Sequence, residues 1–269
     1  VAETGITAAE VTRNFEDLRL NEAAGAVYHF VYDSFCDWYL EIAKPIFNQG
    51  EEVQKAETRA TAAWARDRIL EILHPFMPFI TEELWARTAP TPRKSLLIES
   101  GWPDLSALPK FEDACRDVQW IIDLVSGVRS IRAEMNVPPS AKIELLLKDA
   151  TPQSKELLAR GKTVITTLAR LSNAKLADTL PQGTAQFVIG EATVGLPLGD
   201  VIDFGKERAR LEKELKKAED EIARFDAKLS NEQFVSRAPE DVLNEQREKR
   251  SDAAALANRL REAVNRLAV

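Results

Sequence analysis

The C-terminal part of the chain carries two stretches of heptad-spaced apolar residues, separated by a short polar segment. The apolar positions of the first stretch are Phe204, Leu211, Leu215, Ala218, Ile222, Phe225 and Leu229, and those of the second are Ala253, Leu256, Leu260, Ala263 and Leu267. Alternating steps of three and four residues are typical of a coiled coil. Between them Pro239 suits the first turn of a new helix. We therefore expect an antiparallel helical hairpin about 40 Å long, at about 1.5 Å per residue.

Such a hairpin has no room for a catalytic pocket, and its reach favours contact with something large. The chain has 269 residues, 45 % of them hydrophobic and 29 % charged, which is ordinary for a soluble globular protein of one to three domains. No apolar run approaches the roughly 20 residues that span a bilayer, and the N-terminus shows no secretory signal. Cys36 and Cys115 are isolated, which favours a reduced, cytoplasmic setting.

The charge is unevenly distributed. The whole chain carries a net charge of −7, but residues 206–269 hold fifteen Lys and Arg against fourteen Asp and Glu, so the hairpin is net +1 and the remainder −8. The hairpin is therefore the part that a phosphate backbone repels least. A solvated coiled-coil face of mixed charge is the alternative explanation of the same residues.

The periodicity predicts a mainly α protein with three parts. An N-terminal helical bundle (1–108) leads to a small α/β module (109–202), and an antiparallel coiled-coil arm (203–269) follows. Helical spacing predicts bundle helices at residues 8–15, 21–43, 53–73 and 82–86. We expect the second of these helices to end or kink near Pro45, and Thr81 to be the N-cap of the last. In the module we expect helices at 111–135 and 154–171 and short strands at 143–147, 186–189 and 193–196.

Five strings, in the right order, resemble one family. They are similar to the anticodon-binding bundle and C-terminal arm of bacterial valyl-tRNA synthetases. The strings are Asn21-Glu22-Ala23-Ala24, Phe35-Cys36-Asp37-Trp38-Tyr39-Leu40-Glu41, the stretch 74–85 (HPFMPFITEELW), the stretch 128–139 (VRSIRAEMNVPP), and Leu229-Ser230-Asn231 with Phe234-Val235 and Ala238-Pro239. The 74–85 string is shared with leucyl and isoleucyl synthetases, whereas the second and fifth point to the valyl branch.

The resemblance implies that the bundle reads the anticodon and that the arm contacts the outer corner of tRNA(Val). Class I synthetases resemble one another through His-Ile-Gly-His and Lys-Met-Ser-Lys-Ser strings that bind ATP, and neither occurs here. We therefore expect the catalytic domain of the parent ligase, with its ATP, to be missing, and the first bundle helix to be cut off. For the chain itself we expect no cofactor, no metal, no membrane and a monomer.

Candidate tRNA-binding residues fall into two groups. Aromatic rings can stack on splayed anticodon bases, and arginines can hold phosphates; on the anticodon side these are Tyr28, His29, Tyr32, Arg19, Arg59 and Arg66. On the arm side the candidates are Arg129, Arg132, Lys206, Arg210, Lys213, Lys216 and Lys217. A solvated helix face explains the basic residues equally well, and Arg129 and Arg132 have Glu134 and Asp123 as alternative partners.

A different class of function fits the heptads alone. In that interpretation the hairpin is a protein-interaction element and the bundle a non-catalytic scaffold. Exposed apolar seam residues would favour it, whereas two arms that bury each other's seams favour an intramolecular hairpin. An enzyme acting by itself is disfavoured, because we find no nucleophile–base pair, no paired carboxylates and no phosphate-binding glycine loop.

Overall fold

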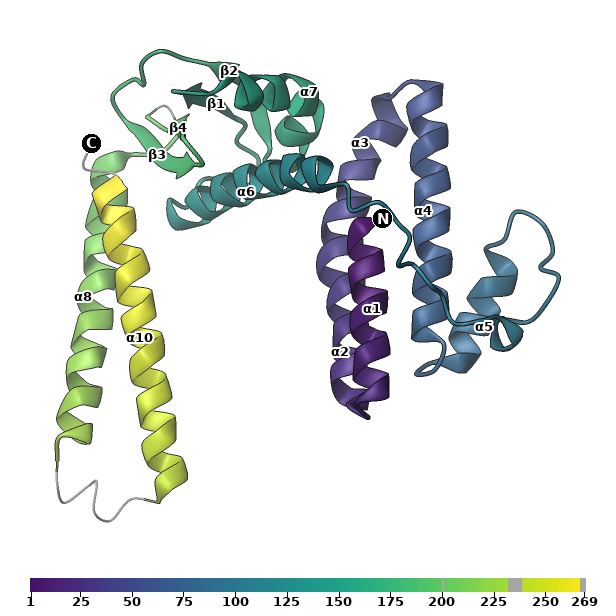
Figure 1. The fold of residues 1–269 in the computed structure, drawn as a ribbon. Coiled ribbons are helices and arrows are strands. Elements are labelled where there is room, and N and C mark those ends of the chain that lie inside the picture. Colours follow the sequence, from purple (N-terminus) through teal and green to yellow (C-terminus); the bar gives the residue numbers. More distant parts are fainter. Residues whose placement is uncertain (200, 232–238, 267–269) are drawn as a thin grey trace. The chain divides into compact units, whose positions relative to one another are not determined.

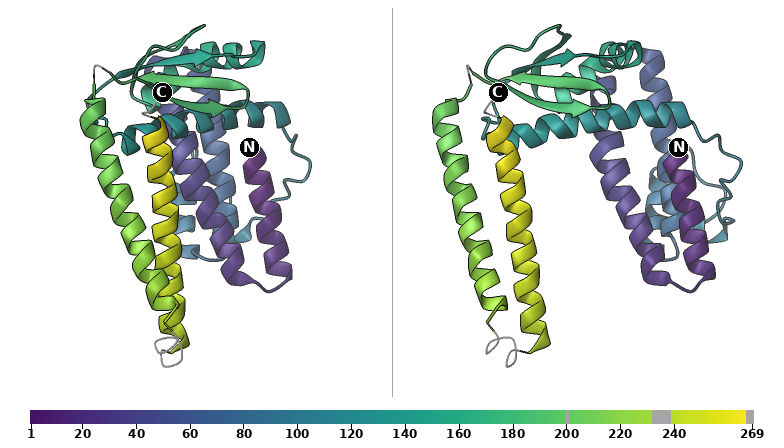
Figure 2. Two further views of the ribbon diagram at one scale, coloured as in Figure 1. Left: turned by 90° about the vertical axis from the view of Figure 1, so that its left-hand side faces the viewer. Right: turned by 60° about the vertical axis from the view of Figure 1, so that its left-hand side comes forward.

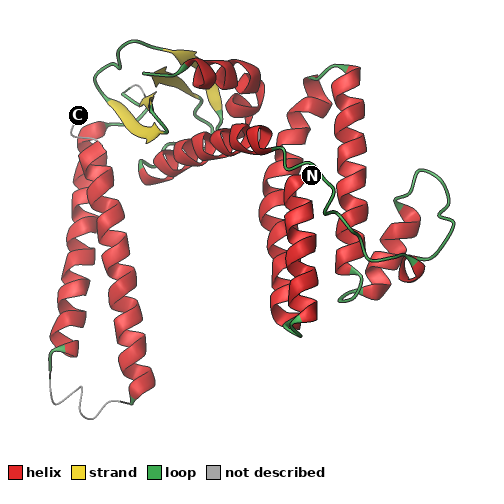
Figure 3. Ribbon diagram, viewed as in Figure 1, coloured by secondary structure: helices red, strands yellow, loops and turns green. Residues whose placement is uncertain are grey.

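The computed structural model describes residues 1–199, 201–231 and 239–266 (Figure 1). The chain divides into two compact units, Val1–Gln119 and Trp120–Val269. The first unit is helical, and the second combines a four-stranded sheet with helices and a long helical hairpin (Figure 3). The expected fold class, mainly α with a small α/β module and an antiparallel hairpin, is confirmed.

The first unit is a bundle built around α1, α2 and α4. Its elements are α1 (Ala2–Glu16), α2 (Leu20–His29), the π-helix η1 (Phe30–Leu40), α3 (Glu41–Gln49), α4 (Glu52–Leu73), α5 (Pro78–Arg87) and the 3-10 turn η2 (Leu97–Glu99). The three main helices contribute the buried core residues Ala8, Val11, Ala23, Val27 and Ile72. Phe15 of α1 stacks on Phe76, with 5.3 Å between ring centroids. Apolar spacing of about 3.6 residues thus produces one shared core.

One expectation about the bundle is wrong in detail, and another is wrong only in part. The helix does not end at Pro45, because α3 continues to Gln49; the proline ring is buried, so packing offsets the hydrogen bond that its missing N–H costs. The alternative, a kink near Pro45, stays a prediction. Thr81 is not an N-cap but lies fully buried inside α5, which starts at Pro78. Its hydroxyl donates to the Met77 carbonyl at 2.9 Å and lies 2.7 Å from His74 Nδ1.

The second unit places a mixed sheet beside two helices. Its elements are α6 (Glu112–Glu134, which starts in the first unit), β1 (Ile143–Lys148), α7 (Pro152–Leu168), β2 (Leu171–Leu176), β3 (Thr184–Ile189), β4 (Ala192–Pro197), α8 (Phe204–Leu229) and α10 (Glu240–Arg266). The strand order is β2-β1-β4-β3. β1 and β2 are parallel across α7, and the other two pairings are antiparallel. Strand β2 was not predicted, because its sequence, Leu-Ser-Asn-Ala-Lys-Leu, is poor in residues that favour strands.

Glycines let the helices of this unit approach their neighbours closely. A Cβ on Gly127 of α6 would lie 2.3 Å from the ring of Phe187 in β3, and one on Gly161 of α7 would lie 3.1 Å from Ile121. Large side chains fill the space between the helices and the sheet, among them Leu124, Ile131, Met135, Leu145, Leu147, Ile165 and Leu196. This core supports the segment from which the hairpin starts.

The hairpin forms as expected, but one seam position of its second arm differs from the expectation. Helices α8 and α10 lie side by side in all views (Figures 1 and 2). The buried residues of their seam are Leu211, Ala218, Ala253, Ala257 and Ala263. Leu256, expected in the seam, is 42 % exposed, and its neighbour Ala257 is buried instead. Pro239 directly precedes α10, while Phe234, Val235, Ala238 and Leu267 lie outside the described residues.

Candidate nucleic-acid interface

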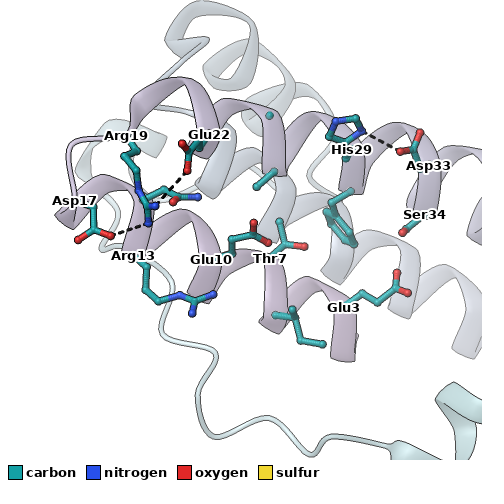
Figure 4. Close-up of a pocket in the computed structure, with 15 residues that line it drawn as sticks. Glu3, Thr7, Glu10, Arg13, Asp17, Arg19, Glu22, His29, Asp33 and Ser34 are labelled. Atoms are coloured by element: carbon teal, nitrogen blue, oxygen red, sulfur yellow. Dashed lines mark hydrogen bonds and ion pairs between the residues drawn. The ribbon is translucent and has the colours of Figure 1, made fainter. Parts of the chain in front are cut away.

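An open groove of about 870 Å³ runs between α1 and the continuous α2–η1 helix (Figure 4). Its wall is mostly polar, with five carboxylates among the lining residues. Arg19, the residue before α2, lies in this wall and pairs with Asp17 at 2.7 Å and Glu22 at 3.4 Å. Arg13 also lines the groove and forms no ion pair with the described part of the chain. Of the two arginines in the groove, Arg19 is thus neutralised by neighbouring carboxylates, whereas Arg13 forms no ion pair with a described residue.

The predicted aromatic cluster is exposed. Tyr28 and Tyr32 are 57 % and 55 % exposed, and their ring centroids lie 4.6 Å apart at 33°. The ring of His29 packs edge-on against Tyr28 at 5.6 Å, and His29 Nδ1 lies 3.0 Å from Asp33 Oδ2. Exposing two large aromatic rings on one helix face costs hydrophobic free energy, and such rings are the surface on which an unpaired base stacks.

The two other arginines predicted on the anticodon side differ. Arg59 is exposed, and its guanidinium lies 5.9 Å from the Phe47 ring, so it remains available to a phosphate. Arg66 is half-buried and donates to the Thr88 carbonyl at 2.8 Å and to Asp67 Oδ1 at 2.7 Å. Its donors connect the end of α5 to α4. Arg66 thus has a structural role that its position in the sequence did not reveal.

The two α6 arginines predicted on the arm side are also engaged internally. Arg132 is 8 % exposed and donates to the carbonyls of Pro138 and Ala141 at 3.1 and 2.9 Å. Burial lowers the pKa of its guanidinium. Arg129 donates to the Leu168 carbonyl at the end of α7, from Nη2 at 3.1 Å. The buried guanidinium of Arg132 is satisfied by backbone carbonyls, which gives this arginine a structural role.

On the arm, Lys206 and Arg210 have different surroundings. Lys206 is exposed near the start of α8 and pairs with the N-cap residue Asp203 at 3.2 Å. Arg210 is half-buried between Glu207 and Glu214 of the same helix. Hydrogen bonds from the guanidinium to Glu207 raise the pKa of Arg210. Two carboxylates already neutralise this arginine.

A row of exposed cations on α8 has no such partner among the described residues. We call it the outer stripe; its members are Lys213, Lys216, Lys217, Arg224 and Lys228. Steps of 4, 7 and 4 residues from Lys213 return to one helix face, away from the seam. None of the five forms an ion pair with a described residue, and the row spans about 22 Å at 1.5 Å per residue. The three lysines nearer the start of α8 were predicted from the sequence. Arg224 and Lys228 were not, although Arg224 follows Lys217 at heptad spacing and Lys228 lies one turn further on.

Other cations of the hairpin are paired. Arg250 and Arg261 of α10 reach across to Asp226 and Glu219 of α8 at 3.0 and 2.8 Å, and Arg208 pairs with Glu212 at 2.9 Å. These pairs strengthen the docking of the two arms without adding net charge. The outer stripe therefore holds the positive charge of α8 that intramolecular pairs leave uncompensated.

Neither a metal centre nor a membrane span is present in the described part of the chain. No group of three or more His, Cys, Asp or Glu side chains in residues 1–199, 201–231 and 239–266 has metal-binding geometry. Among the described helices, none has both the length and the apolar character needed to cross a bilayer. His74 instead caps the end of α4 beside Thr81.

Two protein families match this chain. Residues 1–147, more than half of the chain, match the family described as the anticodon-binding domain of tRNA ligase. The chain belongs to this anticodon-binding family. Residues 203–268 match a second family, described as the valyl tRNA synthetase tRNA binding arm. The aromatic pair lies within the first match, and the outer stripe lies within the second.

Curated relatives agree with both matches. The chain is 48 % identical over 264 residues to valine–tRNA ligase of Mesorhizobium japonicum, covering 97 % of this chain and 28 % of that protein. It is also 48 % identical to the valine–tRNA ligase of Caulobacter vibrioides, over 99 % of this chain and 30 % of that protein. The ligase of Agrobacterium fabrum is 44 % identical, with shares of 99 % and 28 %. The chain thus spans less than a third of the length of these relatives.

Proposed function

We propose that this chain is the tRNA-binding part of a valine–tRNA ligase. In this proposal the bundle binds the anticodon stem-loop, and the α8–α10 arm binds the outer corner of tRNA(Val), where the D and T loops meet. Attachment of valine, with consumption of ATP, takes place in the remainder of the ligase. The chain acts as a monomer, because each of its arms has an intramolecular partner for its seam.

One observation carries the proposal. The two family matches, one for anticodon binding and one for tRNA binding, each contain an exposed feature with the chemistry to contact RNA. In the first, Tyr28 and Tyr32 present two exposed, neighbouring aromatic rings. In the second, the outer stripe presents, along one helix face, cations that form no ion pair with a described residue. Single-stranded loops are recognised by stacking, and double-helical RNA by contacts to its backbone, so the two features suit the two parts of a tRNA.

Binding measurements with purified tRNAs test the proposal. At matched salt, tRNA(Val) should bind at least tenfold more tightly than a tRNA for another amino acid, a difference of about 1.4 kcal/mol or more. A tRNA(Val) transcript with altered anticodon bases is the matched control for the bundle. Equal affinity for all three RNAs would remove valine specificity from the proposal. Binding of none of them would favour the protein-interaction alternative.

Catalysis provides a separate test. Valine-dependent exchange between ATP and pyrophosphate should be absent in this chain alone, at the level of a heat-treated sample. The reason is that neither ATP-binding string of the class I synthetases occurs in the sequence. Exchange above that background would show that the chain contains an activation site that the proposal assigns elsewhere.

A further inference from the structure

Arg210 joins the first turns of the arm to the end of helix α6. Its Nη2 donates to the carbonyl of Glu134, the last residue of α6, at 3.0 Å, across 76 positions in the sequence. Its Nη1 donates to Glu214 at 2.7 Å, and its Nε to Glu207 at 3.0 Å. The last carbonyls of a helix have no partner within the helix, so a cation donating to one of them caps that end and meets the negative end of the helix dipole.

This arginine is poorly placed to bind a phosphate. Two carboxylates hold its planar donors in a fixed direction, and the side chain of Glu207 is only 12 % exposed. The group formed by Arg210, Glu207 and Glu214 has a net charge of −1, which repels an RNA backbone. A phosphate would have to displace an ion pair to reach the guanidinium. The residue therefore differs from the outer stripe, where no such displacement is needed.

The root of the arm has few other attachments. Among the described elements, α8 packs extensively only against α10. Near the root, Leu211 and Leu198 are buried, and the N–H groups of Val201 and Ile202 donate to the Leu198 carbonyl. Apolar packing of this kind resists separation but has little directional preference, whereas a fork of hydrogen bonds is directional.

We infer that Arg210 is a positioning residue that locks the root of the arm to the C-terminal end of α6, so that the outer stripe is held ready for tRNA. This inference rests on the proposed function. Once the bundle has bound a tRNA, a rigidly attached arm meets the same tRNA at a high effective concentration. A loosely attached arm has a lower effective concentration, so tRNA affinity falls although every RNA contact can still form. Arg210 thus contributes to tRNA affinity while touching no RNA.

The first test needs no tRNA. Spin labels at Lys162 of α7 and Ala227 of α8, both exposed, report the distribution of distances between the module and the arm; Cys36 and Cys115 are first replaced by serine. R210M should broaden this distribution clearly, because it removes every hydrogen bond of the guanidinium. R210K should broaden it less, because lysine keeps the positive charge but lacks the planar set of donors. The helical circular dichroism should stay unchanged. An unchanged distribution in R210M would overturn the inference whatever the protein binds.

The second test uses the sign of an effect on tRNA binding. E207Q removes a negative charge from the arm, so a phosphate-contacting Arg210 would bind tRNA more tightly in this variant. A positioning Arg210 loses its support instead, and tRNA affinity should fall about threefold to tenfold with an unchanged salt slope. The matched control is E212Q, which removes the same charge from the exposed Arg208 pair and should not lower affinity. Tighter binding in E207Q, or a salt slope lower by about one unit in R210M, would show that Arg210 contacts a phosphate.

Discussion

The outer stripe allows a quantitative prediction about salt. Lys213 and Lys217 lie one turn apart on the same face of α8 and form no ion pair with a described residue. Each phosphate contact contributes about 0.7–0.9 to the slope of log affinity against log salt, so K213A/K217A should reduce that slope by about 1.4–1.8. Between 50 and 200 mM salt, this corresponds to about tenfold less loss of affinity than in the unmodified chain.

The control for this experiment is R208A/K249A, which removes the same two charges from the same hairpin. Both control cations are already paired, Arg208 with Glu212 and Lys249 with Glu245. Exposed pairs of this kind contribute at most about 1 kcal/mol to stability, so both variants should keep the hairpin. Binding is measured by fluorescence anisotropy of labelled tRNA at four salt concentrations. Equal slopes in the two variants would show that general charge, and not the outer stripe, sets the affinity.

Three further predictions concern other parts of the chain. Y28A and Y32A should each weaken tRNA(Val) binding by about 1–3 kcal/mol, because each removes a ring on which a base can stack, and the salt slope should stay unchanged. Y39F is the control. Wild-type affinity in both alanine variants would show that Tyr28 and Tyr32 do not stack on bases of the tRNA. In the hairpin, A257L should overpack the seam and destabilise it by about 1–3 kcal/mol, whereas L256A, at an exposed position, should be nearly neutral. Hydrogen exchange over residues 211–229 distinguishes the two variants. The reverse order of stability would return Leu256 to the seam position expected from the sequence. Hydrogen bonds from Ser154 and Thr151 lower the pKa of Glu191 from 4.5 to about 2, so the stability that this carboxylate contributes is complete above pH 4.5 and is lost as the pH falls towards 2. S154A should raise the pKa of Glu191, which an NMR titration of the carboxyl group measures. An unchanged titration curve would contradict this prediction.

The elements of this fold are largely predictable because their signals are local. Helix and heptad periodicity located the bundle helices and both arms of the hairpin. Which of Leu256 and Ala257 lies in the seam was not predictable, since both are apolar and the choice depends on the facing helix. Strand β2 was missed because its pairing with β1, not its composition, makes it a strand.

The candidate site was predictable only in part, and arginine shows why. Arg66, Arg132 and Arg210 all donate to backbone carbonyls that lie beyond their own helices. Every residue has a backbone carbonyl, so the amino-acid sequence does not indicate which carbonyl an arginine will bind. These partners can be identified only from the folded structure. Lysines of the outer stripe and the tyrosine pair were predictable, because exposure follows from helical position relative to an apolar face.

The most direct test of the whole account is deletion of residues 206–269. Because α8 and α10 pack mainly against each other, the remaining chain should keep its own cores, which circular dichroism verifies. The account predicts that the shortened chain binds tRNA(Val) at least tenfold more weakly at matched salt, a loss of about 1.4 kcal/mol or more. If the shortened chain bound tRNA(Val) as tightly as the whole chain, the arm would not be an RNA-binding element, and the protein-interaction alternative would take its place.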